Sequence, residues 1–385
     1  MKKIWQAAVA AVLAFDWPLL ILLGVMASLG LTIMQSAVGL ADPRFSEQYR
    51  NFVLAFFLMW GVALVPPKWL QRFAVVIYAV AVLLLLGVEF FGETSKGATR
   101  WLNLGLFRIQ PSEGLKIAVP LMLAWYFHQR QNTQMGLLDM LMVVVILVIP
   151  FFLVVRQPDL GTAVLIFVVG LCVIYFAGFP FRWLLPLMIV VVGGLALMLY
   201  YEDTLCDPDF DWKILHGYQK HRICTLFNPS LDPLGKGFHT IQSMIAVGSG
   251  GMYGKGFMQG TQAHLDFIPE RSTDFIFAVF AEEFGLYGGV VLLTLYGLIV
   301  LRGLWIAAYA TDQFSRLVAG AMAMMIAVYV FVNIGMVTGI LPIVGVPLPF
   351  LSYGGTALMT LGIACGILMS VSGHREEEQP PGTLA

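Results

Sequence analysis

Ionisable side chains gather in the stretch His264–Gly285, where a polar segment meets a long apolar run. Four of them fall within nine residues: Asp266, Glu270, Arg271 and Asp274. The apolar run continues to about Leu301, long enough to cross a bilayer as a helix, so Asp274 lies where an aqueous loop enters hydrocarbon. A carboxylate is costly in that position unless it has a partner or a function.

The same residues admit a purely structural interpretation. Ser272 or Thr273 could cap the N-terminus of the helix, with Asp274 facing the positive end of the helix dipole. The pattern around Asp274 does not separate the two interpretations, so the decision depends on the rest of the chain.

A second polar group lies in Gly97–Lys116, before and into another apolar run. Its members are Arg100, Arg108, Gln110, Glu113 and Lys116. The Pro-Ser pair directly before Glu113 is typical of a helix start, which places Glu113 and Lys116 one turn apart on one face. These two could form an intrahelical ion pair. Alternatively, Arg100 and Lys116 could bind a phosphate, with Trp101 as a wall of that site or as an interfacial anchor.

A third group occupies Tyr218–Lys255 and carries the cations Arg222, Lys236 and Lys255. The glycine-rich run Gly248–Gly260 departs from the Walker A pattern, which argues against a nucleotide site. Its backbone N–H groups could cradle a pyrophosphate, or the run could be a plain flexible loop.

The ionisable residues in or beside the apolar runs lie toward the outer ends of those runs. They include Glu113, Lys116, Asp159, Asp274, Glu282 and Glu283. A secondary transporter places its site near the midplane of the bilayer, so this distribution favours chemistry at the membrane surface.

Composition identifies the broad class of protein. Of the 385 residues, 59% are hydrophobic and 12% are charged, about half the charged share of a soluble domain. The net charge of −1 gives no reason to expect a nucleic-acid partner. Four cysteines without a C-x-x-C pair and six scattered histidines indicate no metal site.

The chain contains ten apolar runs that could span a membrane, and we predict an all-α polytopic protein with one integral membrane domain over residues 1–385. The runs are roughly 17–37, 51–66, 74–91, 113–128, 137–155, 160–178, 183–201, 274–301, 316–337 and 348–371. With both termini in the cytoplasm, the inner side carries nine Lys and Arg residues in short loops and chain ends, and the outer side seven. Residues 203–271 then form one long, functional periplasmic loop, and residues 374–385 a polar cytoplasmic tail.

Motifs run in order from about Gly97 to Gly355. They are GATRWLNLG with QPSEGLK, QPDLGTA, YQKHRI with NPSLDPLGKG, IQSMIAVGSGGMYGKG, GTQAHLDFIPERSTDFIFAVFAEEFG and GVPLPFLSYGG. Together they resemble the SEDS family (shape, elongation, division and sporulation), and in particular its RodA-like rod-shape branch. Ser272 stands where relatives often have His, so we do not expect it to be an obligatory acid or base.

The resemblance implies a peptidoglycan glycosyltransferase of the bacterial inner membrane. Such enzymes polymerise lipid II into glycan strands and release undecaprenyl pyrophosphate, here for cell elongation and rod shape. The implied partners are a class B penicillin-binding protein that crosslinks the product, other elongation-complex proteins and membrane lipids. The resemblance also implies that Asp274 is the essential outer-face aspartate.

The residues suit this chemistry. Pyrophosphate leaves readily once its charge is balanced, so one base and a set of cations suffice and no general acid is required. Asp274 is the expected base, and Asp266 is a lesser candidate. The residues expected to contact substrate are Arg100, Trp101, Glu113, Lys116, Asp159, Arg222, Lys255, Asp266, Glu270 and Arg271. No cofactor is required for this scheme, and a divalent cation such as Mg²⁺ is left open.

Two other functions are weighed against the polymerase. A flippase for lipid II needs a polar cavity through the bilayer, yet the inner halves of the runs offer few ionisable groups. A non-catalytic scaffold for the transpeptidase has no need of the outer cluster of acids and cations.

The cysteines carry a separate expectation. Cys206 and Cys224 both lie in the long loop, and an oxidising periplasm would favour a disulfide between them, the alternative being two unpaired thiols. Cys172 and Cys365 lie in apolar runs and should stay reduced.

Overall fold

The computed structural model of the chain describes most of its residues. These are residues 15–95, 98–103, 108–131, 133, 136–157, 159–178, 189, 193, 194, 197, 200–207, 224, 236–264, 268, 270–341 and 343–374. The chain divides into two compact units. Unit 1 comprises Met1–Ala177, Leu293–Val330 and Pro349–Ala385, and unit 2 comprises Gly178–Leu292 and Phe331–Leu348.

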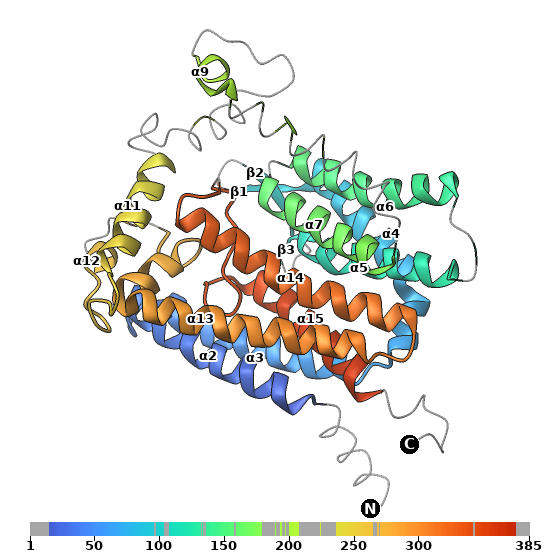
Figure 1. The fold of residues 1–385 in the computed structure, drawn as a ribbon, viewed down its shortest axis with the longest axis horizontal. Helices are drawn as coiled ribbons and strands as arrows, with labels where there is room; N and C mark the ends of the chain where they lie inside the picture. Colours follow the sequence, from blue (N-terminus) through green and yellow to red (C-terminus); the bar gives the residue numbers. More distant parts are fainter. Residues whose placement is uncertain are drawn as a thin grey trace, which may run out of the picture. The chain divides into compact units, whose positions relative to one another are not determined.

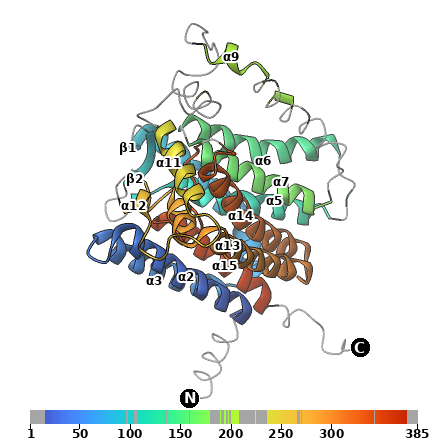
Figure 2. The ribbon, with the colours of Figure 1, turned by 60° about the vertical axis from the view of Figure 1, so that its left-hand side comes forward.

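Unit 1 is built from long helices. They are α2 (Trp17–Val38), α3 (Pro43–Ala63), α4 (Pro67–Phe91), α5 (Pro111–Gln129), α6 (Leu137–Arg156), α7 (Leu160–Phe176) and α15 (Gly355–Gly373), with parts of α13 (Ile276–Ala308) and α14 (Gln313–Val337). The helix α15 packs along α3, and α5 packs along both α4 and α7 (Figures 1 and 2). Glycines permit the first of these contacts, because a Cβ added at Gly362 would lie 2.7 Å from the carbonyl oxygen of Ala55.

A buried carboxylate joins three helices of unit 1. Asp16 is 6% exposed and caps α2 by accepting the N–H of Leu19 at 3.1 Å. It also accepts two hydrogen bonds from Arg302 of α13, at 3.0 and 2.8 Å, and one from Ser372 of α15 at 2.8 Å. One side chain therefore fixes the ends of α2, α13 and α15 relative to one another.

A small antiparallel sheet precedes α5, and the sequence analysis did not anticipate it. Its strands are β1 (Glu93–Ser95), β2 (Ala98–Asn103) and β3 (Arg108–Ile109), in the order β1-β2-β3. Asn103 and Arg108 both donate to Glu93, and these hydrogen bonds hold the pKa of its carboxyl below the usual value. The sheet matters to the site because β2 carries Arg100 and Trp101.

Unit 2 contains shorter helices in the region predicted as one long loop. They are α9 (Glu202–Leu205), α11 (Lys236–Ser249) and α12 (Thr261–His264), followed by the first part of α13. A disulfide joins Cys206 to Cys224, the pairing expected for this loop, and Cys172 and Cys365 are free thiols.

Nine of the ten predicted spans contain a helix among the described residues, and the run 183–201 lies mostly outside them. Six helices are long and apolar enough to cross a membrane: α2, α4, α6, α13, α14 and α15. Four predicted bounds differ from the helix ends by seven or eight residues, at the starts of α3, α4 and α15 and at the end of α13. The helix α3 begins at Pro43, because Asp42 caps it, and α15 begins only at Gly355, because Phe350 has a φ of +62° that no helix continues.

The disulfide can be tested on intact protein. We expect an alkylating reagent to add two labels per chain under denaturing, non-reducing conditions, and four after reduction, because only Cys172 and Cys365 carry thiols. Mass spectrometry counts the labels. Reduction should lower the free energy of unfolding by about 3 kcal/mol, the chain-entropy value for a loop of this size. Four labels without reductant would contradict the pairing.

Candidate functional site

The first polar cluster lies at the start of α5, in unit 1. Lys116 is 2% exposed, and its Nζ donates to Glu113 Oε1 at 2.5 Å and to the hydroxyl of Tyr329 in α14 at 2.6 Å. The ammonium also lies 4.9 Å from the centroid of the Tyr329 ring. The ion pair that the sequence left open is therefore present, with a third member that the sequence analysis missed.

Glu113 has an unused acceptor in this cluster. Its Oε2 is buried and has no hydrogen-bond partner among the described residues. A buried carboxylate oxygen without a donor is costly.

Asp159 forms the adjoining part of the cluster. It caps α7 and accepts from Gln110 Nε2 at 3.1 Å, while the guanidinium of Arg100 lies 3.9 Å from its other oxygen. Gln110 is the N-cap residue of α5, so the caps of α5 and α7 are joined directly. Arg100 reaches this group from β2 and keeps 27% of its side chain exposed, and Trp101 beside it is half-buried.

The second polar cluster surrounds Asp274, in unit 2. Residues 271–275 form turns directly before α13, and the hydroxyl of Thr273 donates to the Glu270 carboxylate at 2.8 Å. Asp274 thus precedes the first helical residue, Ile276, by two positions. Glu270 and Arg271 are half-buried in the same turns, and Ser272 is buried.

Asn333 anchors the backbone of Asp274, a contact the sequence analysis did not find. Its amide nitrogen donates to the carbonyl of Asp274 at 2.8 Å and to the carbonyl of Val346 at 2.7 Å. Asn333 is fully buried near the end of α14. An Asn inside an apolar span requires hydrogen-bond partners, so the position of Asn333 in the sequence was a signal that such a contact exists. The side chain of Asp274 lies beside Gly345, where an added Cβ would be 3.3 Å from Asp274 Oδ2.

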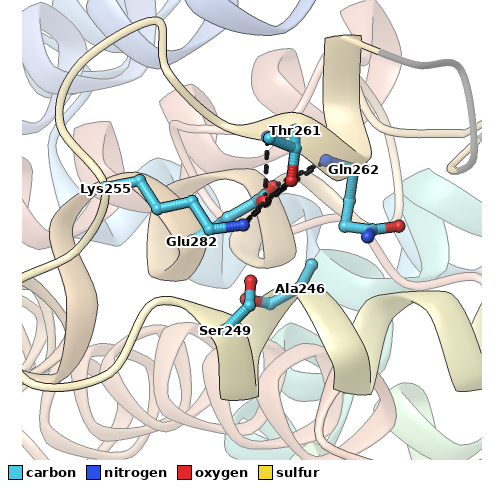
Figure 3. Close-up of polar contacts among 6 residues, drawn as sticks. All are labelled: Ala246, Ser249, Lys255, Thr261, Gln262 and Glu282. Atoms are coloured by element: carbon cyan, nitrogen blue, oxygen red, sulfur yellow. Dashed lines mark hydrogen bonds and ion pairs between the residues drawn. The ribbon is translucent and has the colours of Figure 1, made fainter.

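Lys255 lies in a third group, also in unit 2. Its Nζ is 2.6 Å from Glu282 Oε1, and the hydroxyl and backbone N–H of Thr261 donate to the same oxygen (Figure 3). The predicted contact of Lys255 with a phosphate stays a prediction. The other two candidates, Arg222 and Asp266, lie outside the described residues.

An apolar cavity of about 580 Å³ lies among α2, α3 and α15 of unit 1. Leu20, Leu23, Phe52, Phe56, Phe350 and Leu358 are among the side chains that line it. Its chemistry suits a hydrocarbon chain rather than a polar ligand. Within the part of the chain that the structure describes, no three His, Cys, Asp or Glu side chains are grouped to hold a metal ion.

Comparison with known proteins identifies relatives along nearly the whole chain. The sequence profile of a family described as "Cell cycle protein", which covers FtsW, RodA and SpoVE, matches residues 10–377. Peptidoglycan glycosyltransferase MrdB of Escherichia coli strain K12 is 45% identical over 358 residues, which are 93% of each chain. Peptidoglycan glycosyltransferase RodA of Treponema pallidum is 33% identical and covers 94% of this chain and 98% of its own.

Two solved structures share the fold. A chain of a peptidoglycan synthase complex that coordinates polymerization and crosslinking matches with a TM-score of 0.76 and 31% identity, over 95% of this chain and 99% of that one. The rod shape determining protein RodA of Thermus thermophilus matches with a TM-score of 0.68 and 27% identity, over 95% and 98%.

The buried ion pair predicts a non-additive stability effect. Lys116→Met leaves the Glu113 carboxylate buried without its cation, and we expect the free energy of unfolding to fall by about 3–5 kcal/mol. Glu113→Gln combined with Lys116→Met should cost less than the sum of the single changes, since the two groups act on each other. Thermal denaturation of the purified proteins in detergent measures all three. Additive losses would show that the pair is not coupled.

Proposed function

The chain belongs to the FtsW/RodA/SpoVE family of cell cycle proteins and is a multi-pass membrane peptidoglycan glycosyltransferase, and we propose that Asp274 is the base with which it polymerises lipid II. The observation that carries the proposal is the placement of this carboxylate. It lies in a turn directly before a 33-residue apolar helix, with its backbone anchored by Asn333. A lipid-linked sugar presents its hydroxyl at this level if its tail stays in the bilayer.

The proposed reaction is a single displacement. The acceptor sugar hydroxyl gives its proton to Asp274, and its oxygen forms a bond to the anomeric carbon of the donor. The bond from that carbon to the pyrophosphate oxygen breaks, and its electron pair leaves with undecaprenyl pyrophosphate. Attack from the face opposite the leaving group inverts the anomeric centre. No acid is needed, because the leaving group departs as an anion.

The leaving pyrophosphate needs cations, and we assign that role to Arg100, supported by Lys116. Arg100 keeps 27% of its side chain exposed, and its guanidinium lies 3.9 Å from Asp159. An ammonium has three donors, and Lys116 uses two of them on Glu113 and Tyr329. A site of this kind stabilises charge as it develops on the leaving group.

We further propose that both termini are cytoplasmic and that residues 203–271 lie in the periplasm. The disulfide between Cys206 and Cys224 supports this orientation, because such bonds persist in oxidising compartments. The matching chain comes from a complex that combines polymerization with crosslinking, which supports a transpeptidase partner, and we propose a class B penicillin-binding protein in that role.

The decisive test is Asp274→Asn. Asparagine keeps the size of the side chain and can still cap a helix, but it cannot accept the proton. We expect normal purification and a fall of about 10²–10⁴-fold in the rate of glycan polymerisation from lipid II, measured with and without the transpeptidase. If Asp274 only stabilised the helix start, Asp274→Asn would cost about 1 kcal/mol of stability or less and leave the polymerisation rate nearly unchanged.

The same assay separates the rival functions. Wild-type polymerisation by Asp274→Asn would remove Asp274 as the base. Absence of polymer from the wild-type protein, with lipid II crossing proteoliposome membranes, would favour a flippase. Absence of both, with stimulation of the transpeptidase, would favour a scaffold.

The cation assignment makes a separate prediction. Arg100→Gln should slow polymerisation about tenfold or more through lost charge stabilisation, with the melting temperature nearly unchanged. Lys116→Met should also slow it. If Glu113→Gln restores the activity that Lys116→Met removes, Lys116 serves only its ion pair and has no role toward phosphate. Initial rates against lipid II concentration supply the measurement, with Arg108→Gln on the exposed strand β3 as the matched control.

A further inference from the structure

The helix α13 is broken at Gly285, whose φ of 63° and ψ of −161° are not helical. A break removes backbone hydrogen bonds on both sides, and the segment Gly251–Gly256 replaces them. The N–H groups of Lys255 and Gly256 donate to the carbonyls of Glu282 and Glu283, both at 3.0 Å, and the N–H groups of Leu286 and Tyr287 donate to the carbonyls of Gly251 and Met252, at 2.9 and 3.1 Å.

Glycines make this insertion sterically feasible. A Cβ at Gly254 would lie 2.1 Å from the carbonyl oxygen of Glu283, and one at Gly250 would lie 2.1 Å from that of Ala281. At Gly285 itself, a Cβ would lie 2.4 Å from the backbone nitrogen of Gly254. The glycine-rich run is therefore a wedge, residues 250–256, held in backbone contact with the broken helix, rather than an open loop.

A buried carboxylate locks the wedge in place. Glu282 is 0% exposed, and its Oε1 accepts from Lys255 Nζ at 2.6 Å, from the Thr261 N–H at 2.9 Å and from the Thr261 hydroxyl at 3.0 Å (Figure 3). The N–H of Gln262 lies 3.2 Å from each carboxylate oxygen. Both the backbone and the side chain of Glu282 thus hold the chain between Lys255 and Gln262.

We propose that Glu282 is a positioning residue. Together with Lys255 it holds the wedge in the break and so fixes the direction of residues 276–284 of α13. That helical piece follows directly after the turn that contains Asp274. Without the lock, the four backbone groups at the break lose their partners and the piece is free to turn about Gly285. Misplacement of a reacting group by about 1 Å can cost about 10²-fold in rate. The kinetic consequence rests on the proposed role of Asp274.

The ion pair with Glu282 gives Lys255 a structural role, which is an alternative to the predicted role in binding a phosphate of the substrate. An ammonium with a charge-assisted bond to a buried carboxylate is held at that carboxylate, because breaking the pair leaves an uncompensated charge in the interior. Loss of Lys255 should then loosen the wedge. Loss of a phosphate ligand should instead weaken substrate binding and leave the wedge intact.

The test combines hydrogen exchange with kinetics on the full-length purified chain. Glu282→Gln and Lys255→Met should speed amide exchange of residues 251–256 and 286–287 about tenfold or more and lower kcat about tenfold or more, with KM for lipid II within about twofold. A role in stability alone would lower the yield of folded protein and leave kcat per folded molecule unchanged. Tyr253→Phe, 80% exposed on the same segment, is the matched control and should change neither reading.

Three results would overturn the inference. They are unchanged exchange in both variants, fast exchange with wild-type kcat, or a raised KM in Lys255→Met with slow exchange retained. If Glu282→Gln does not fold, Lys255→Met at the partly exposed end of the pair decides by the same readings. Asp274→Asn should abolish polymerisation with wild-type exchange; a fully active Asp274→Asn would remove the base, while the exchange data still decide the fate of the lock.

Discussion

A backbone N–H or C=O placed away from water must find a partner, and this constraint acts most strongly where a membrane helix is broken. The break at Gly285 leaves two carbonyls and two N–H groups that the helix cannot satisfy. All four are satisfied by one short segment, Gly251–Gly256. The geometry of this part of unit 2 follows from that requirement, because the wedge and α12 are both tied to residues 282–287 of α13.

The same constraint governs charged side chains. Three charged side chains are almost completely buried: Asp16, Lys116 and Glu282. Each of them is paired with a side chain of opposite charge and makes at least one further hydrogen bond. A buried ion pair adds little net stability compared with apolar packing, but the loss of one partner is expensive. Such groups therefore act chiefly by excluding alternative arrangements of the helices. Asp16 fixes three helix ends, Lys116 joins α5 to α14, and Glu282 holds the wedge.

The features predictable from sequence were those encoded locally. Hydropathy predicted the helices, and the position of Asp274 before an apolar run predicted its place at a helix start. The spacing of Glu113 and Lys116 offered their ion pair as one of two alternatives. The small sheet was missed because its strands have three, six and two residues, too short for a periodic signal. Tyr329 was missed because 213 residues separate it from Lys116. The role of Glu282 was missed because a carboxylate in a helix does not reveal which distant backbone groups it accepts from.

Asp274 has its backbone held by a buried amide and a glycine beside its side chain. Asn333 bridges the carbonyls of Asp274 and Val346, so the turn before α13 and the GVPLP segment are held to a single buried amide. Gly345, directly before Val346, has a φ of +72°, so any residue with a side chain would be strained there. Its Cβ would also lie 3.3 Å from Asp274 Oδ2. The backbone of Asp274 is thus held in place, and the residue beside its carboxylate is one without a side chain. Such an arrangement suits the role of base that we propose for Asp274, because a backbone fixed before substrate arrives holds the reacting carboxylate in position.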